Sequence, residues 1–593
     1  MAVGSRPAPA TPVAASRSRP LHIRWLGRVR YADAHALQHG LFANGGDDHL
    51  LLLEHPHVFT LGARGDATNI LADPAAIDAE VVHVDRGGDV TYHGPGQLVG
   101  YPILTVPGKR GGGMADTAAY VHSVEQLLID ALARLGLPGC GRLDDYPGVW
   151  VEPESPEPRK IAAIGVRLSR GRSMHGFALI VAPDMSYFDA IVPCGIADKA
   201  VTSLRAEGSD QPLRAVVDVV AALASERWGT GGVERADVAW RIRPEDLSAF
   251  SRGEGPGDIP VVGRPQAPPA LQAAPAESSP APADDDVPVR LLGRLAEAGV
   301  SGGLAITERK PEWMRVKADM GPDYRRLKGV MRDLELVTVC EEAGCPNIFD
   351  CWNDGTATFM ILGERCTRKC GFCLVDTRKP LVPDLDEPAR VAEAVDKMAL
   401  QYAVVTMVAR DDLPDGGASG VAATIRAIRD RNPATRVEVL ISDLKGEPDD
   451  LQTVFEAAPD VLNHNIETVP RLQRAVRPSA SYARSLAVLA RANQAGLVTK
   501  TSIIVGMGET PAEVQATLAD LAGIGVDIVT IGQYLRPTTN HLPIDRWWHP
   551  DEFAALKRVG ESLGITQVEA GPLTRSSYHA KQAEHAASTS AHA

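Results

Sequence analysis

Three cysteines stand at a spacing that suits an iron–sulfur cluster with one open iron. They occupy the stretch Cys366-Thr-Arg-Lys-Cys370-Gly-Phe-Cys373, which has the pattern Cys-x3-Cys-x2-Cys. Three thiolates ligate three irons of a four-iron cluster, and the fourth iron then stays free to bind and activate a small molecule. The alternative is half of a zinc site, although zinc sites normally show paired Cys-x2-Cys or Cys/His ends. The spacing therefore favours redox chemistry over a structural metal.

A second group of cysteines comes shortly before the first. Cys340, Cys345 and Cys351 form a Cys-x4-Cys-x5-Cys pattern, so six of the eight cysteines in the chain fall between positions 340 and 373. Such clustering is typical of metal ligands rather than of a disulfide scaffold, and it indicates a reducing compartment. One four-iron cluster cannot use six thiolates, so the second set predicts a cluster of its own.

Length and composition predict a protein of more than one domain. The chain has 593 residues and a formal charge of −14, which argues against a nucleic-acid binder, and it has no long uncharged apolar run that could span a membrane. Segments rich in Pro, Ala and Ser are too poor in apolar groups to fold. We therefore predict a disordered tail over 1–20, a first domain over 21–249, a linker over 250–288 and a second domain over 289–593.

The first domain mixes helices and strands without a regular βαβ repeat. Its clearest helix runs from Asp116, which can cap the start, to Leu135, and Gly136 ends it. Upstream, the glycine-rich stretch from Arg86 to Gln97 would let backbone approach a ligand closely. His93 in this stretch would, without further information, be a buried core histidine.

The second domain alternates strand-like and helical segments, which predicts an α/β fold with six βα units in a partial (β/α)6, TIM-like barrel. The apolar run from Thr356 to Leu362 directly precedes Cys366, so the cluster would lie at the carboxyl end of a strand, where such folds keep their active sites. The segment 289–310 reads as helical. Strands are expected near 357–362, 403–408, 436–441, 460–466, 498–505 and 527–533, with helices over 388–402 and 511–525.

Three segments of the first domain carry a family resemblance. They are Lys160-Ile-Ala-Ala-Ile-Gly165, His175-Gly-Phe-Ala and Val192-Pro-Cys194-Gly-Ile. With them the domain resembles lipoyl (octanoyl) transferases, which have the α/β fold of biotin and lipoate protein ligases. The resemblance implies that Cys194 carries the octanoyl group as a thioester and that Lys160 tunes this thiol, in line with the need of a thiol nucleophile for an activating neighbour. It places substrate binding at Arg86, Gly87, Gly88, Asp89, Val90, Thr91, Tyr92, His93, Ala163, Ile164, Gly165, Gly176, Phe177 and Ala178.

No motif surrounds Cys140, so we expect it to be a small buried apolar residue.

The second domain resembles lipoyl synthases of the radical S-adenosylmethionine (SAM) class from about Lys310 to Ala580, with a radical SAM core at about 340–580. The resemblance rests on both cysteine sets and on motifs such as Asn463-His-Asn-Ile-Glu467 and Arg575-Ser-Ser577. It implies two [4Fe-4S] clusters. The first reductively cleaves SAM to a 5'-deoxyadenosyl radical, which abstracts hydrogens from carbons 6 and 8 of the octanoyl chain, and the auxiliary cluster supplies sulfur.

The same resemblance assigns ligands. Cys366, Cys370 and Cys373 would hold the SAM cluster, and Cys340, Cys345, Cys351 and Ser577 the auxiliary cluster. A serine oxygen is a poor ligand for a soft metal, which would suit a cluster that is dismantled in use; without the cysteines, Ser577 would read as a helix cap. Asn463 and Glu467 are candidates for binding SAM, although turn chemistry explains each of them nearly as well.

Two positions depart from the lipoyl synthase pattern. Ala409 stands where the family usually has Asp, and Asp376-Thr-Arg-Lys-Pro380 stands where it more often has Gly-Lys-Pro. Neither position is a cysteine. The first departure removes a polar contact near the barrel, so we expect it to affect the rate rather than the reaction type.

Together these features predict a cytoplasmic, bifunctional enzyme of protein lipoylation. Its partners would be octanoyl-acyl carrier protein, lipoyl-accepting carrier domains (2-oxoacid dehydrogenase E2 and glycine cleavage H protein) and a reductant protein, with no nucleic acid and no membrane. Three alternatives come from other classes: a non-catalytic metal-binding second half, an ATP-using lipoate ligase in the first half, and a first half that is only a scaffold.

Overall fold

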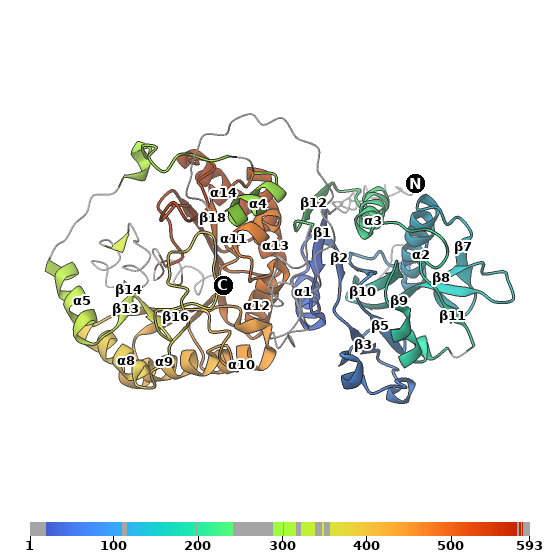
Figure 1. The fold of residues 1–593 in the computed structure, drawn as a ribbon, viewed down its shortest axis with the longest axis horizontal. Coiled ribbons are helices and arrows are strands. Elements are labelled where there is room, and N and C mark those ends of the chain that lie inside the picture. The colour runs from blue at the N-terminus through green and yellow to red at the C-terminus, as the bar shows by residue number, and fades with distance from the viewer. Residues whose placement is uncertain are drawn as a thin grey trace, which may run out of the picture.

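The computed structural model describes residues 19–109, 115–196, 198–240, 289–300, 302–315, 322–338, 347–348 and 356–577, together with 580, 582 and 584. Two large sheets, each with its own helices, form the two halves of the molecule (Figure 1). The predicted linker and nearly all of the predicted tail lie outside the described residues. Within the described residues no helix combines the length and the apolar character needed to cross a membrane.

A nine-stranded mixed sheet forms the amino-terminal half, in the order β12-β1-β2-β6-β10-β9-β8-β7 with β11 beside β9, and β4-β3-β5 form a smaller sheet. The strands β1 and β2 are parallel, whereas β2, β6, β10, β9, β8 and β7 pair antiparallel in turn. The bounds are β1 (Leu21–Arg28), α1 (Tyr31–Asn44), β2 (Asp48–Glu54), β3 (Val58–Leu61), β4 (Glu80–His83), β5 (Val90–His93), β6 (Gln97–Ile103), α2 (Thr117–Arg134), β7 (Cys140–Leu143), β8 (Tyr146–Val151), β9 (Arg159–Ser169), β10 (Arg172–Ile180), β11 (Ala200–Val201), α3 (Leu213–Trp228) and β12 (Val233–Asp237).

The predicted helix of this half is confirmed as α2. The Asp116 carboxylate caps it by accepting a hydrogen bond from the backbone N–H of Ala119 at 3.1 Å. The apolar stripe of α2 is buried, and together with α3 it covers one face of the sheet in a shared apolar core. The helix α1 packs on the other side, against β6 and β10.

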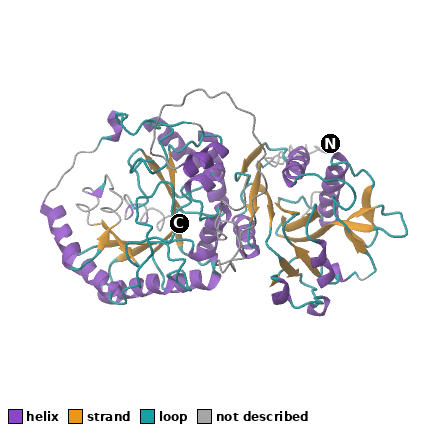
Figure 2. Cartoon of the chain, viewed as in Figure 1, coloured by secondary structure: helices purple, strands orange, loops and turns teal. Residues whose placement is uncertain are grey.

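An eight-stranded sheet forms the carboxyl-terminal half, in sequential order from β13 to β20, and every pairing except β13–β14 is parallel. Figure 2 shows the helices on the outer side of this curved sheet, as expected when each crossover places a helix on the sheet. The bounds are α4 (Val289–Glu297), α5 (Pro322–Asp333), β13 (Val337–Thr338), β14 (Thr356–Ile361), α8 (Glu387–Met398), β15 (Tyr402–Met407), α9 (Ala418–Arg431), β16 (Arg436–Leu440), α10 (Pro448–Glu456), β17 (Val461–Asn463), α11 (Gln473–Val476), α12 (Tyr482–Gln494), β18 (Val498–Val505), α13 (Pro511–Gly523), β19 (Ile528–Gln533), α14 (Pro550–Ser562) and β20 (Gln567–Gly571).

All six predicted barrel strands are present, as β14 to β19. Each of these strands is followed by a helix, so the six predicted βα units are confirmed; the sheet also contains two strands that were not predicted, the parallel strand β20 and the antiparallel edge strand β13. β20 is polar, and Val568 is its only fully buried residue, so the short strand leaves no apolar pattern in the sequence. The predicted helix over 289–310 is also too long, since α4 ends at Glu297.

The two halves share one apolar core, and α1 lies inside it. Leu37 and Leu41 of α1 belong to the same buried cluster as Leu486 and Leu489 of α12 and Leu521 of α13. The helices come so close that a Cβ added at Gly40 would lie 2.9 Å from the Cβ of Ala490. The halves therefore meet in a packed interface and are not joined by the linker alone.

Buried ion pairs cross this interface. The Asp33 carboxylate, only 1% exposed, accepts hydrogen bonds from Arg484 at 3.0 Å and Arg491 at 3.2 Å. On β1, the strand before α1, the Arg24 guanidinium donates to the Asp520 carboxylate at 2.9 Å. The Tyr482 hydroxyl donates to the same carboxylate at 2.8 Å. Because a buried charge is costly without its partner, these pairs strongly favour one relative position of the two halves.

Replacing Asp33 should loosen this interface. Asp33→Asn removes the anion between Arg484 and Arg491, and loss of one partner of a buried pair costs on the order of 3 kcal/mol. We expect faster amide hydrogen exchange in α1 and α12 of the full chain. The matched control is Asp218→Asn, whose carboxylate is half exposed and pairs with Arg235; it should cost less than about 1 kcal/mol. Unchanged exchange in Asp33→Asn would contradict this account of the interface.

Candidate active sites

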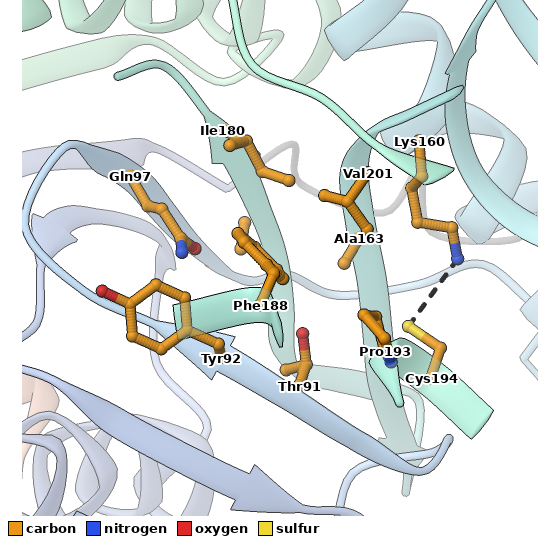
Figure 3. Close-up of a pocket in the computed structure, with 11 residues that line it drawn as sticks. Thr91, Tyr92, Gln97, Lys160, Ala163, Ile180, Phe188, Pro193, Cys194 and Val201 are labelled. Carbon is orange, nitrogen blue, oxygen red and sulfur yellow. Dashed lines mark hydrogen bonds between the residues drawn. The ribbon is translucent and has the colours of Figure 1, made fainter. Parts of the chain in front are cut away.

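Cys194 and Lys160 form the centre of the site in the amino-terminal half. Cys194 lies on the short 3-10 turn Pro193–Gly195 with φ of 57°, a left-handed conformation that non-glycine residues rarely adopt. Its Sγ is 3.7 Å from Nζ of Lys160, which is 5% exposed on β9 (Figure 3). The lysine nitrogen also lies 4.8 Å from the centre of the Trp150 ring. A buried amino group thus points at a thiol that the backbone holds in an uncommon conformation.

A mostly apolar pocket leads to this pair. Ala163, Ala178, Ile180, Phe188 and Val201 line it, and Thr91, Tyr92 and Gln97 add polar groups. Both polar side-chain atoms of Gln97 are buried and have no hydrogen-bond partner among the described residues. An apolar slot that ends at a thiol suits an acyl chain, and the Gln97 amide offers a donor and an acceptor for a polar group on it.

The predicted substrate stretches meet around this pocket. Thr91, Tyr92, Ala163 and Ala178 line it directly. Asp89 orders the loop beneath Cys194, because its carboxylate accepts hydrogen bonds from the Asn69 amide at 2.6 Å and the Asp66 N–H at 2.9 Å.

Arg86, Gly87 and Gly165 pack together beside the pocket. The Arg86 guanidinium donates to the carbonyl and hydroxyl oxygens of Thr60, at 2.7 and 2.8 Å. A Cβ on Gly165 would lie 2.9 Å from Cδ of Arg86 and 3.0 Å from the carbonyl oxygen of Gly87. Gly88, with φ of 95°, lies in the turn that leads to β5, so the glycines are needed for close packing and for the turn.

Other predicted residues lie away from the pocket lining. Val90 packs into a small apolar core with Phe59, Phe177 lies in the main core of this half, and Ile164 packs on that core. Gly176 pairs with Gly165 across the sheet. His93 is buried between Tyr31 and His55, and burial followed by its cationic neighbours lowers its pKa well below the usual value. His93 is therefore neutral and part of the core.

Sequence reasoning missed several residues of this pocket. Ile180, Phe188 and Val201 carry no chemical signal, and only the fold brings them to Cys194. Gln97 closes the glycine-rich stretch, so the pattern contained it without singling it out.

Cys140 is half-buried rather than fully buried as expected. It packs against the core of the amino-terminal half, and burial together with Glu207 raises the pKa of its thiol to about 11.

In the carboxyl-terminal half, the loop that follows β14 carries Cys366, Cys370 and Cys373, and none of the three forms a disulfide bond. Backbone hydrogen bonds hold this loop, from Cys366 N–H to the Asp376 carbonyl and from Gly371 N–H to the Val476 carbonyl, both at 2.8 Å. Burial and the neighbouring thiols raise the pKa of Cys370 to about 12 and that of Cys373 to about 11. Protonated thiols of this kind lose their protons when a metal ion binds them.

An unpaired polar group lies near these thiols. Glu467 is half-buried with φ of 65°, and its Oε1 accepts from the Asn465 amide at 3.0 Å, while its buried Oε2 has no partner among the described residues. Burial raises the pKa of Glu467, and its charge acts on both Cys370 and Cys373. An orphaned buried acceptor near the three thiols fits a polar ligand of a metal ion that they would bind.

Asn463, the other predicted SAM contact, lies on β17. Its amide donates to Glu438 at 2.8 Å, and Glu438 pairs with the fully buried Lys500 at 3.0 Å. Oδ1 of Asn463 is likewise buried without a partner in the described part of the chain. Of the two predicted residues, Asn463 is buried and Glu467 half-buried, and only Glu467 acts electrostatically on the thiols.

The second cysteine set, Cys340, Cys345 and Cys351, lies outside the described residues. Ser577 is described and half-buried. One contact links the two regions: the side-chain amide of Asn347 donates to the backbone carbonyl of Leu573 at 2.7 Å. Asn347 lies between Cys345 and Cys351 in sequence, and Leu573 lies four residues before Ser577.

The structure explains how the departure at Ala409 is accommodated. The carbonyl of Ala409 accepts hydrogen bonds from the N–H and the hydroxyl of Thr367, both at 3.0 Å. Arg368, the next residue, pairs with Asp411 and Asp443. Backbone and these neighbouring carboxylates hold the cysteine loop, so no side-chain carboxylate is needed at position 409.

Comparison with known proteins follows the same division of the chain. A family model described as "Lipoyl protein ligase A/B catalytic domain" matches residues 30–224. Models described as "N-terminal domain of lipoyl synthase of Radical_SAM family" and "Radical SAM superfamily" match residues 301–345 and 360–521.

Two lipoyl synthases each match about half of this chain. A lipoyl synthase from Mycobacterium avium is 58% identical over 273 residues, covering 46% of this chain and 89% of the relative. A lipoyl synthase from Nocardia farcinica is 54% identical over 302 residues, covering 51% and 85%. Among solved structures, a bi-partite lipoate protein ligase from Thermoplasma acidophilum has a TM-score of 0.32 and 14% identity, covering 38% of this chain and 88% of that one.

Proposed function

The chain belongs to the lipoyl synthase family and carries a lipoyl protein ligase A/B catalytic domain ahead of its radical SAM region, and we propose that it makes protein-bound lipoyl groups in two consecutive steps. In the first step, octanoate passes from acyl carrier protein through Cys194 to a lysine of a carrier domain. In the second step, two sulfurs are inserted at carbons 6 and 8 of the octanoyl chain. The observation that carries the first step is the Cys194–Lys160 pair at the end of an apolar pocket.

The first step is a double acyl exchange. Lys160 accepts the proton of the Cys194 thiol, the sulfur attacks the thioester carbonyl of the octanoyl carrier, and the carrier thiol leaves with a proton. The amine of the acceptor lysine then attacks the Cys194 thioester, an amide forms, and Cys194 is released as a thiol. The apolar residues of the pocket would contact the eight-carbon chain in both exchanges, and Lys160, 3.7 Å from Sγ, is positioned to take and return the proton.

The thiol favours transfer over ATP-dependent ligation. A ligase activates a free acid with ATP and needs no nucleophilic side chain at the acyl carbonyl. Here the pocket residues converge on Cys194, whose backbone is held at φ of 57°. A constrained thiol at the end of an acyl slot is the arrangement that a covalent intermediate requires.

The second half supplies ligands for the cofactors of its family. Cys366, Cys370 and Cys373 would hold a [4Fe-4S] cluster, and the unpaired oxygens of Glu467 and Asn463 would bind polar groups of SAM. When bound, SAM and the iron–sulfur centres supply the carbon–hydrogen activation and the sulfur. The chain's own residues fix the cysteine loop, exclude water through burial and orient the SAM cofactor. Cys340, Cys345, Cys351 and Ser577 are proposed ligands of the auxiliary [4Fe-4S] cluster, in keeping with the Asn347–Leu573 contact.

The proposal includes the domain bounds and the partners. We assign acyl transfer to residues 21–249 and sulfur insertion to 289–593, with the radical SAM core at about 340–580. Octanoyl-acyl carrier protein, lipoyl-accepting carrier domains and a reductant protein are the partners that the two reactions require, and cytoplasmic localisation would give access to all three.

The thioester is the first testable consequence. Mixing the chain with octanoyl-acyl carrier protein should add one octanoyl group to Cys194, seen by intact and peptide mass spectrometry. Cys194→Ala should abolish the adduct, and Lys160→Met should slow its formation by about 100-fold, the low end of general acid–base effects. Cys140→Ala is the matched thiol control and should behave as wild type. An adduct that persists in Cys194→Ala, or that requires ATP, would overturn the transfer mechanism.

Metal content tests the second half. After anaerobic reconstitution the chain should hold about eight irons and about eight sulfides, and a variant with Cys366, Cys370 and Cys373 changed to Ala should hold about four of each. Cys140→Ala with Cys194→Ala should leave both counts unchanged. Zinc in place of iron, or iron that does not respond to the triple change, would sink the proposal for this half.

We further propose that joining the two halves keeps the carrier near both sites. A protease site placed in 251–288 and cut should make the flux from octanoyl carrier to lipoyl protein fall on dilution, more steeply when Asp33→Asn also weakens the α1 interface. The same dilution should lower the flux of the uncut chain less. If the cut Asp33→Asn chain keeps full flux at every dilution, the physical connection has no role.

A further inference from the structure

Two histidines and an aspartate outside both sites converge on one point of the amino-terminal half. They are His35 on α1, Asp85 in the loop after β4, and His175 on β10. One ligating atom from each lies within 4.8 Å of the other two. The Nε2–Oδ1 distance from His175 to Asp85 is 2.7 Å, and that from His35 to Asp85 is 3.9 Å. Three segments far apart in sequence thus bring metal-ligating atoms together.

These distances are close to those of a bound metal. Nitrogen and oxygen ligands at about 2.0–2.2 Å from a tetrahedral Zn²⁺ lie roughly 3.3 Å apart. The observed 2.7 and 3.9 Å lie on either side of that value and each differ from it by about 0.6 Å, and the two histidine nitrogens lie within 4.8 Å of each other, so side-chain shifts of roughly an ångström would close the site. His39, one helical turn beyond His35, places its Nε2 3.1 Å from Nε2 of His35 and is a further nitrogen next to the group.

The surroundings of the side chains also suit ligation. The second oxygen of Asp85 pairs with Arg167, and a hydrogen bond of this kind commonly orients a ligating carboxylate. His175 is 1% exposed, His35 half-buried and Asp85 exposed, so a cation has a route from solvent.

Positive charge opposes the binding of a cation. Arg167 lies on Asp85, and Arg86 and Arg491 also act on the histidines. Arg491 is compensated by Asp33, and Arg167 by Asp85 itself. Arg167 pairs with Asp85, which is itself one of the three proposed ligands, so Arg167 should have the largest effect on the affinity for a cation.

We propose that His35, Asp85 and His175 form a binding site for a divalent transition-metal ion of the Zn²⁺ type. Two imidazoles and one carboxylate with an open position form a donor set that suits Zn²⁺ and, with further open positions, Fe²⁺. The ion would join α1, which packs on the barrel, to the segments that begin at Arg86 and Gly176 beside the acyl pocket. The inference does not depend on the reaction proposed for either half.

Cobalt is the probe, because its visible bands report the ligands. Full-length chain with its iron–sulfur clusters reconstituted is titrated anaerobically with Co²⁺, and X-ray absorption is then recorded on the zinc form. Wild type should bind one ion through nitrogen and oxygen ligands, without the near-ultraviolet band of a thiolate ligand.

Four variants decide the assignment. His35→Gln and Asp85→Asn should each weaken binding at least tenfold, whereas Arg167→Gln should tighten it. His122→Gln, which removes an exposed histidine of α2, is the matched control and should bind as wild type. Each changed side chain is at least partly exposed, and circular dichroism checks that every variant is folded. Three results would overturn the proposal: wild type that binds no ion through nitrogen and oxygen, an ion surrounded by sulfur, or binding by His35→Gln and Asp85→Asn as tight as that of wild type.

Discussion

The arrangement of the molecule depends on one helix, α1, which is buried on more than one side. It packs on β6 and β10 of its own half and on α12 of the other half, where Asp33 accepts hydrogen bonds from Arg484 and Arg491. A helix that faces solvent on one side would carry polar residues there. Eight residues of α1 are instead buried, among them the polar Asp33 and Gln38, and Gly40 allows α12 to approach closely. The apolar surface of α1 is therefore fully covered, and the Asp33 carboxylate paired, only when both halves are present.

This constraint gives the two active sites a common framework. The face of the sheet that α1 covers includes β10, and β10 also provides Ala178 and Ile180 to the acyl pocket. In the barrel half, α12 follows α11, whose Val476 carbonyl holds the loop of Cys370 through the N–H of Gly371. Short runs of chain thus connect the interface to each site. The linker supplies covalent continuity, while the packed core supplies the relative position.

Chemistry that is local in sequence could be predicted. Cysteine spacing, the apolar strand before Cys366 and the capped helix after Asp116 each involve neighbouring residues, so periodicity and motif reading were sufficient. The resemblance to two families added Cys194, Lys160 and the glycine-rich stretches, and the structure brings several of these around one pocket. Phe188 and Val201 could not be predicted, because apolar residues carry no mark of the pocket that they line.

Features that depend on long-range packing could not be predicted either, because no pattern of neighbouring residues marks them. The pairs Arg24–Asp520 and Asp33–Arg484 join residues more than 400 positions apart, and an isolated Asp or Arg in a sequence reads as surface charge. β20 is polar and gains its strand conformation from pairing with β19 rather than from its own residues. His35, Asp85 and His175 come from three separate segments, so no spacing rule could have joined them.

The central claim is that one chain carries out both steps on the same carrier. The most direct test is a single-turnover experiment, in which an unmodified carrier domain is mixed with this chain, octanoyl-acyl carrier protein, SAM and a reductant without oxygen, and the carrier is followed by intact mass. The account predicts that octanoyl carrier rises first and then converts to lipoyl carrier, with only the second conversion dependent on SAM. Octanoyl carrier that accumulates without conversion while the clusters are loaded, or lipoyl carrier that forms without an octanoyl stage, would contradict it.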